Sequence, residues 1–339
     1  MGRAYFIVGP TATGKSELAA DIAHELGAEI VSADAFQIYQ GVDLLTGKPD
    51  GDTLAKAPHH LIGMVPLTEE MNAEKYRRSA NYAIEEINSR GKLAIVVGGS
   101  GLYIKTLTHG LALLPGLDPK LRERLNAMSL DELCSQLVEL DLEAAGKIDV
   151  KNRRRVVRAL EICLLTGKPA SAQREQWVRD AGNPAREGFQ KAAVSGPPLG
   201  ASWRSPLLEG TQTGLSASPG RGVFVFRDRE ELYERINQRV EKMFERGVIE
   251  EVRAAGVTSA TASQMIGFRE IEEFLTGKKS LRQCVAEIQQ ATRRYAKRQL
   301  TWFRRQTNFS PLNLSFVTHN EAVKWILLRM LSETGTRDD

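Results

Sequence analysis

The chain has 339 residues, of which 42% are hydrophobic and 26% are charged, and its formal net charge is +4. This length allows one large domain or two modest ones, and the composition is typical of a globular protein rather than a disordered or fibrous one. No apolar run could span a bilayer, and the first residues match neither a secretory signal nor a myristoylation site. The three cysteines lie far apart, so we expect reduced thiols in a cytoplasmic protein.

The first hundred residues alternate apolar strands with amphipathic helices. We expect strands over 4–8, 28–33 and 92–97, and helices over 15–26 and 73–89. Such alternation predicts an α/β fold, in which a mostly parallel sheet is covered by helices on both faces.

From about residue 117 the pattern becomes purely helical. Apolar residues have helical spacing in 118–128, 130–140 and 151–166, which predicts an all-helical insertion domain over 117–181. Residues 182–222 are rich in Gly, Pro, Ser and Ala and have no sustained apolar period, so we expect a flexible linker there.

Order is expected to resume at residue 223. A short apolar strand over 223–226 precedes a long helix, and a basic helix covers 281–305. We therefore assign residues 1–116 and 223–330 to one core domain that includes the C-terminal helices.

The residues after the first strand fit the pattern G-x-x-x-x-G-K-[ST] of a phosphate-binding loop, and they lie between a strand and a helix, as this motif requires. Glycines let backbone amides turn toward a phosphate, and the start of the helix adds partial positive charge. The lysine adds a full charge, and the final hydroxyl can bind Mg²⁺. A match by chance is expected in roughly one of a hundred chains of this length. The loop consists of Gly9, Pro10, Thr11, Ala12, Thr13, Gly14, Lys15 and Ser16.

Two further turns should lie beside this loop, because the carboxyl ends of parallel strands meet at one edge of a sheet. Asp34 follows the second strand, and a glycine turn with Ser100 follows the third. The strand before Asp34 is only partly apolar, unlike the Walker B strand typical of a kinase or NTPase. Asp34 could simply cap a turn, but its place beside a phosphate loop favours a catalytic role.

These residues resemble the bacterial tRNA dimethylallyltransferases. The matching motifs run in order over about residues 4–305, so the resemblance covers nearly the whole chain. Besides the phosphate loop they are Ser32-Ala33-Asp34, Gln37-Ile38-Tyr39, Asp43, Thr46-Gly47-Lys48-Pro49, Pro58-His59-His60-Leu61, Val97-Gly98-Gly99-Ser100-Gly101-Leu102-Tyr103, Arg158-Ala159-Leu160-Glu161, Asp228-Arg229-Glu230-Glu231-Leu232 and Ala296-Lys297-Arg298-Gln299.

The resemblance implies a P-loop NTPase-like core and a role for each matching residue. Asp34 would take a proton from an adenine amine, and the loop from Thr11 to Ser16 would hold the prenyl diphosphate with Mg²⁺ at Ser16. Ser100 would bind the bridging oxygen of the diphosphate, and Arg229 would grip it from the other side. Contacts with tRNA would come from Asp34, Ala35, Phe36, Gln37, Ser100, Arg122, Arg154, Arg155, Val156, Val157 and Arg158.

The implied reaction moves a dimethylallyl group from its diphosphate to the adenosine 3′ of the anticodon of tRNA, by a monomeric enzyme that needs no membrane. Two basic segments agree with an RNA substrate, since positive helices contact phosphates and planar side chains stack on unpaired bases. The first contains Arg153, Arg154, Arg155 and Arg158; the second contains Arg293, Arg294, Lys297, Arg298, Arg304 and Arg305, interleaved with Tyr295 and Trp302.

Other interpretations stay open at this point. The chain could be a small-molecule kinase, a prenyl transferase that acts on free AMP or ATP, or a non-catalytic RNA-binding protein. Arginine-rich segments are often only solvated helix faces. Arg229 could pair with a neighbouring glutamate, and His59 and His60 are expected in a loop without metal-ligand spacing.

Overall fold

The computed structural model describes residues 4–111, 114–116, 118–173, 221–306 and 308–334. The described residues form two compact units. The first contains residues 4–108 and 221–334, and the second contains residues 109–173. Nowhere in the described ranges does a helix combine the length and the apolar character needed to cross a membrane.

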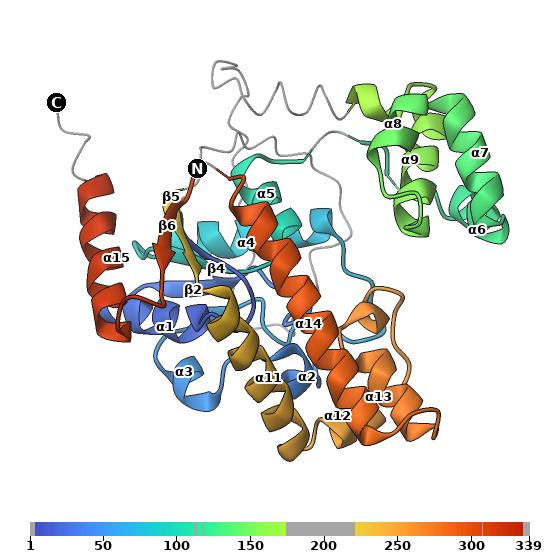
Figure 1. The fold of residues 1–339 in the computed structure, drawn as a ribbon. Helices are drawn as coiled ribbons and strands as arrows, with labels where there is room; N and C mark the ends of the chain where they lie inside the picture. The colour runs from blue at the N-terminus through green and yellow to red at the C-terminus, as the bar shows by residue number, and fades with distance from the viewer. Residues whose placement is uncertain (1–3, 112–113, 117, 174–220, 307, 335–339) are drawn as a thin grey trace, which may run out of the picture. The chain divides into compact units, whose positions relative to one another are not determined.

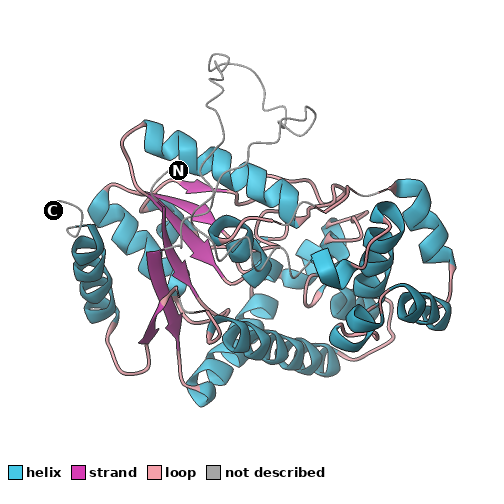
Figure 2. Ribbon diagram, turned by 90° about the horizontal axis from the view of Figure 1, so that it is seen from above, coloured by secondary structure: helices cyan, strands magenta, loops and turns pink. Residues whose placement is uncertain are grey.

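A six-stranded sheet forms the centre of the first unit, and every strand pair in it is parallel. The sheet is visible between two helical layers in Figure 2. In spatial order its strands are β3 (His59–His60), β2 (Glu29–Ser32), β4 (Ala94–Gly98), β1 (Ala4–Val8), β5 (Arg221–Phe226) and β6 (Ser310–Asn313).

Each central strand is apolar on both faces because helices cover both sides of the sheet. On β1, Tyr5 and Ile7 belong to one apolar core, and Phe6 and Val8 belong to the other. Successive side chains of a strand point to opposite faces, which explains this alternation. The first core includes α1 (Lys15–Leu26) and α15 (His319–Thr334), and the second includes α4 (Ala73–Ser89) and α5 (Gly101–Thr108).

The remaining helices of this unit follow β5, apart from two short ones, as Figure 1 shows. Several have clear starting signals: Ser280 and Gln283 form a capping box at the start of the long α14, for example. These elements are α2 (Asp43–Thr46), α3 (Gly51–Ala55), α11 (Arg229–Glu245), α12 (Val248–Ala254), the 3₁₀ helix η1 (Ala262–Gln264), α13 (Phe268–Leu275) and α14 (Leu281–Phe303).

The second unit is helical throughout its described part and has its own apolar core. Leu125, Leu133, Leu137 and Leu160 are almost fully buried in this core. Its helices are α6 (Pro119–Ala127), α7 (Leu130–Leu140), α8 (Leu142–Lys147) and α9 (Arg153–Thr166).

The predicted α/β fold is confirmed, with corrections at the strand boundaries. His59 and His60 form β3 rather than a loop. Most of the predicted linker over 182–222 lies outside the described residues, but Arg221 and Gly222 are the first residues of β5. A Cβ on Gly222 would lie 2.2 Å from the carbonyl oxygen of Phe6, so this glycine lets β5 approach β1 and is part of the sheet.

Candidate active site

Three turns meet at the carboxyl ends of β1, β2 and β4. The strand register places Val8 beside Gly98 and Ser32 beside Val97. Hydrogen bonds continue this pairing past the strands, from Gly9 N to Gly98 O (3.2 Å) and from Ala33 N to Val97 O (2.7 Å). The phosphate loop, the turn at Asp34 and the turn at Ser100 are therefore neighbours, as the motifs predicted.

The phosphate loop wraps the start of α1. Ala12 and Gly14 have positive φ angles of 64° and 93°, which turns the backbone tightly before the helix. Thr13 Oγ1 and Lys15 Nζ both donate to the carbonyl oxygen of Pro10, at 3.0 and 3.1 Å. No side chain caps the helix start at Gly14 in the described structure, so the first-turn amides can bind an anion.

Burial lowers the pKa of Lys15 to about 8; the carboxylate of Asp34 opposes this effect and the guanidinium of Arg239 adds to it. Burial destabilises the charged ammonium more than Asp34 stabilises it, so an anionic ligand at this site would be favoured. A bound diphosphate would supply the negative charge and hold Lys15 protonated.

Three arginines that the motifs did not single out donate hydrogen bonds to the phosphate loop. Arg227 Nε donates to Thr13 O and Arg235 Nε donates to Ala12 O, each at 2.9 Å. Arg239 Nη1 donates to Thr11 Oγ1 at 2.8 Å. Arg235 and Arg239 lie one helical turn apart on α11, so a basic i, i+4 pair after the Asp228-Arg229 motif was the signal in the sequence.

Arg229 has different surroundings. It is exposed in the first turn of α11, and its guanidinium lies over the ring of Tyr233 at 5.2 Å from the centroid. Within the described residues it makes no hydrogen bond to the phosphate loop. Its grip on a diphosphate stays a prediction.

The turn after β2 holds Asp34 half-buried. Its Oδ1 accepts from Phe36 N at 3.0 Å and from Gln37 N at 3.4 Å. The adjacent amide of Ala35 donates to Ser100 Oγ at 2.9 Å. One carboxylate oxygen therefore caps the turn, while Oδ2 takes no part in these bonds and can accept a proton.

Both ends of the Gln37 side-chain amide form hydrogen bonds within the protein. Its Oε1 accepts from Ser32 Oγ at 3.2 Å, and its Nε2 donates to Gly47 O at 2.9 Å. These bonds hold the turn of Gly47 beside Asp34. Gly47 has a φ of 58°, which favours glycine, and a Cβ there would lie 1.4 Å from Arg239 Nη2, so a side chain would strain the backbone and displace the arginine.

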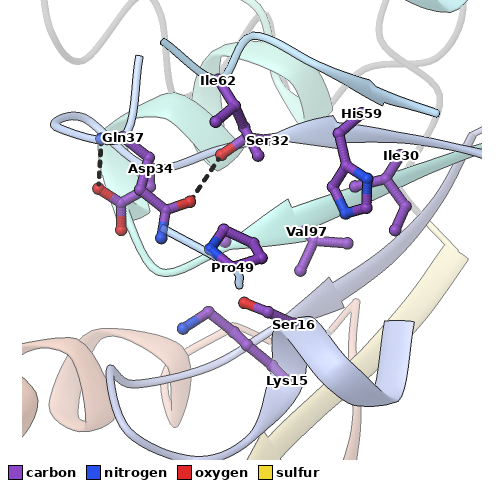
Figure 3. A pocket seen from close by; sticks show the side chains of 11 residues that line it. Lys15, Ser16, Ile30, Ser32, Asp34, Gln37, Pro49, His59, Ile62 and Val97 are labelled. Carbon is purple, nitrogen blue, oxygen red and sulfur yellow. Dashed lines mark hydrogen bonds between the residues drawn. The ribbon is translucent and has the colours of Figure 1, made fainter. Parts of the chain in front are cut away.

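A pocket opens between α1 and the ends of β2 and β4. In Figure 3, Lys15 and Ser16 lie below the pocket, Asp34 and Gln37 lie on one side, and His59 and Ile30 lie on the other. One part of the pocket is polar and the other is largely apolar. It is lined by Lys15, Ser16, Ile30, Ser32, Asp34, Gln37, Pro49, His59, Ile62, Val97 and Gly98.

The oxygen donors of this pocket suit Mg²⁺. Mg²⁺ usually keeps several waters and takes one or two protein oxygens together with substrate phosphates. The Ser16 hydroxyl and the Asp34 carboxylate both line the pocket. Among the described residues no three His, Cys, Asp or Glu side chains form a metal-binding group.

In the helical unit, Arg122 and Arg158 are held by a buried glutamate. Arg122 donates two hydrogen bonds to Glu161, at 2.6 and 2.8 Å, and Arg158 donates to the same carboxylate at 3.2 Å. Arg154 and Arg155 are exposed in the first turn of α9. These two arginines are the free cations of the predicted RNA-binding segment within the described part of this unit.

The predicted tRNA contacts of Val156 and Val157 need correction. Both side chains are buried, at 0% and 3% exposure, in the core of the helical unit. A helix places residues three or four apart on one face, so the positions directly after Arg154 and Arg155 turn inward. The valine side chains pack the core of the helical unit, and contact of Arg154 and Arg155 with RNA stays a prediction.

Comparison with known proteins assigns the chain to a family. A family model described as IPP transferase matches residues 37–198 and 205–306. The tRNA dimethylallyltransferase 1 of Citrifermentans bemidjiense is 40% identical over 304 residues, which cover 88% of each chain. The chain belongs to the IPP transferase family. The tRNA dimethylallyltransferase of Akkermansia muciniphila is 38% identical over 301 residues, covering 89% of this chain and 90% of that one.

Solved structures of IPP transferases have the same fold. The full-length tRNA isopentenylpyrophosphate transferase of Bacillus halodurans is similar with a TM-score of 0.66 and 29% identity, covering 98% of this chain and 97% of that one. A eukaryotic dimethylallyltransferase acting on tRNA has a TM-score of 0.73, covering 99% of this chain and 81% of that one. At 23% identity, this second likeness concerns the fold alone.

Proposed function

We propose that the enzyme transfers a dimethylallyl group from dimethylallyl diphosphate to the exocyclic amine of the adenosine 3′ of the anticodon in tRNA, and releases diphosphate. One observation carries this proposal: a carboxylate and a phosphate-binding loop line the same pocket in an IPP transferase. The relatives in Citrifermentans bemidjiense and Akkermansia muciniphila are named as tRNA dimethylallyltransferases.

The reaction makes two demands on the site. The adenine amine is a weak nucleophile because its lone pair is delocalised into the ring, so a proton must leave as the N–C bond forms. Asp34 would accept this proton at Oδ2, and a general base contributes about 10²–10⁴-fold to the rate. The position of Oδ1 is fixed by Phe36 N and Gln37 N, which orients the carboxylate.

The second demand is the breaking of the allylic C–O bond, which leaves charge on the diphosphate. Lys15 and the loop amides would neutralise that charge, together with Arg239 beside Thr11. Ser100 would donate its proton to the bridging oxygen, as its hydroxyl already accepts from Ala35 N. Mg²⁺, held by Ser16 and the diphosphate, would add positive charge at the leaving group.

For the tRNA, we propose that Arg154 and Arg155 contact phosphates, while Asp34, Ala35, Phe36, Gln37 and Ser100 surround the target base. An adenosine in a single-stranded loop leaves its stack at a cost of a few kcal/mol. Arg229 stays a candidate for the outer side of the diphosphate. We further propose that the enzyme acts as a monomer in the cytoplasm, where tRNA is found.

The decisive experiment supplies the protein and Mg²⁺ with labelled dimethylallyl diphosphate, and offers unmodified tRNA in one reaction and AMP with ATP in another. We expect label in tRNA and none in free nucleotide. Label on AMP or ATP would replace the proposal with a nucleotide prenyl transferase. ATP turnover without prenyl transfer would replace it with a kinase.

A further inference from the structure

One face of α14 contacts two of the three turns that form the site. Gln299 is 5% exposed and lies between the phosphate loop and the turn before Ser100. Its Oε1 accepts from Thr11 N at 3.0 Å, and its Nε2 donates to Gly99 O at 2.9 Å. The two partners fix the orientation of the amide, because one is a donor and the other is an acceptor.

The glycines of this turn allow the helix to approach closely. A Cβ on Gly99 would lie 2.3 Å from Gln299 Nε2 and 2.8 Å from Gly9 O. A Cβ on Gly101 would lie 2.7 Å from Trp302 Cδ2. Neither glycine is among those with positive φ, so close contacts rather than backbone conformation disfavour a side chain here: the carbonyl of Gly9 at Gly99, and the Trp302 ring of α14 at Gly101.

Tyr295 joins the same face one helical turn before Gln299. Its side chain is partly buried near the side chains of Ser100 and Gln299. Burial and the nearby carboxylate of Asp34 raise the pKa of Tyr295 well above its ordinary value, and the polar groups of Ser100 and Gln299 act in the opposite direction. Tyr295 therefore adds a second side chain of α14 near Ser100, and its stacking on RNA stays a prediction.

We propose that Gln299 is a positioning residue for prenyl transfer. It sets the distance between the phosphate loop, which would hold the leaving diphosphate, and the turns at Ser100 and Asp34, which would bind the acceptor base. It ties the phosphate loop at Thr11 to the turn of Gly99 and Ser100, and Ser100 in turn binds Ala35 N beside Asp34. The inference rests on the proposed function. Gln299 acts through these turns, and a misplacement of about 1 Å can cost roughly 10²-fold in rate.

The two hydrogen-bond partners of residue 299, one a donor and the other an acceptor, favour an amide over other side chains of similar size. Methionine at this position has a similar shape but neither donor nor acceptor, so both ties are lost. A glutamate accepts from Thr11 N but turns an oxygen toward Gly99 O, which repels it. A protonated glutamic acid restores both bonds, because it has one O–H donor and one acceptor oxygen.

This leads to a test in the full-length enzyme with labelled dimethylallyl diphosphate and tRNA. Gln299→Met should lower kcat roughly tenfold to hundredfold and leave the KM for tRNA unchanged. Gln299→Glu should lose activity at neutral pH, and its activity relative to the wild type should rise as the pH is lowered. The matched control is Gln290→Met on an exposed position of α14, which should behave as the wild type at every pH.

Two results would overturn the inference. One is that the activity of Gln299→Glu relative to the wild type does not change with pH. The other is that Gln299→Met keeps the wild-type kcat. If Gln299→Glu does not fold, a double-mutant cycle of Gln299→Met with Ser100→Ala decides. We expect the double variant to lose much less kcat than the product of the fold-losses of the two single variants. A loss of kcat equal to that product would refute the link between Gln299 and Ser100. An inactive wild-type enzyme would instead refute the proposed function.

Discussion

At the scale of single residues, the two oxygens of Asp34 have different surroundings: Oδ1 caps its turn, and Oδ2 is the proposed base. Asp34→Asn keeps an acceptor for Phe36 N and Gln37 N but removes the base. We expect kcat to fall by about 10²–10⁴-fold, because the adenine proton then has no acceptor. The affinity for tRNA should stay within about twofold, as measured by filter binding, since an amide occupies the same space.

The matched control is Asp52→Asn, which removes an exposed carboxylate of α3 and should leave kcat unchanged. If Asp34→Asn retained full turnover, the carboxylate would serve only as the cap of its turn. A collapse of tRNA affinity with normal turnover of bound tRNA would make Asp34 an RNA contact.

The sequence predicted the loop, Asp34 and Ser100 because each follows a strand and carries a recognisable motif. It did not predict Arg227, Arg235 or Arg239, whose contacts depend on how α11 crosses the phosphate loop. Such contacts join residues more than two hundred positions apart; the basic i, i+4 pair Arg235 and Arg239 marks a helix face but does not show which loop that face meets. The motif drew attention to Arg229 instead, which lies exposed over Tyr233.

The arginines of α11 give a second prediction. Arg239→Lys keeps the charge but loses the planar group that reaches both Thr11 Oγ1 and Thr46 O. We expect the KM for dimethylallyl diphosphate to rise about tenfold or more, since a charge-assisted hydrogen bond contributes about 1.5–3 kcal/mol. Steady-state kinetics at saturating tRNA measures this change.

Arg229→Lys serves as the comparison in the same assay. A larger rise in KM for Arg229→Lys than for Arg239→Lys would assign the main grip on the diphosphate to the exposed arginine. The reverse order would assign it to the arginine that already contacts the loop.

At the scale of elements, the start of β2 is held by a buried glutamate that does not line the pocket. Burial would raise the pKa of Glu29, but hydrogen bonds from His60, Lys92 and Arg90 outweigh it and lower the pKa to about 2. These three partners come from β3 and from the segment between α4 and β4. Glu29 thus links the edge strand β3 to the body of the sheet.

The lowered pKa predicts a dependence of stability on pH. The folded pKa of Glu29 lies below its ordinary value of 4.5, so its contribution is complete above about pH 4.5 and is lost as the pH falls toward 2. Glu29→Gln should lower the free energy of unfolding by about 1–3 kcal/mol at pH 7. The difference from the wild type should shrink between pH 4.5 and pH 2 in denaturant titrations.

Glu85→Gln, at an exposed position of α4, is the control and should change the free energy of unfolding by less than about 0.5 kcal/mol. A deficit for Glu29→Gln that is the same at pH 3 and pH 7 would mean that packing, not charge, links β3 to the sheet.

Elements with a long apolar period were predictable, and short ones were not. The helices Lys15–Leu26, Ala73–Ser89 and Leu130–Leu140 agree with the sequence prediction because each has repeated apolar turns and an end signal. β3 has two residues and β6 has four, and β6 contains Pro311. Pairing with a neighbouring strand makes these segments strands, so local sequence could not identify them.

At the scale of the whole molecule, the proposed active site belongs to one unit, and the second, all-helical unit has its own apolar core. In that unit, Glu161 is fully buried and holds Arg122 and Arg158. This pairing distinguishes arginines that maintain the unit from Arg154 and Arg155, which remain exposed. Sequence reasoning grouped all of them, because burial of the partner glutamate depends on the tertiary packing of α6 against α9.

The exposed arginines give the last prediction. Arg154→Ala should weaken tRNA binding, and the slope of log K against log salt concentration should become shallower by about 0.7–0.9, because each phosphate contact releases bound counterions. Titrations of tRNA at several salt concentrations measure the slope. The matched control is Lys324→Ala on α15, which removes the same charge from another exposed helix. An equal change in both variants would reflect net charge alone, while no change for Arg154→Ala would make this arginine part of a solvated surface. A change confined to Arg154→Ala, with kcat at saturating tRNA unaltered, would assign RNA capture to the helical unit and leave the chemistry to the pocket at Asp34.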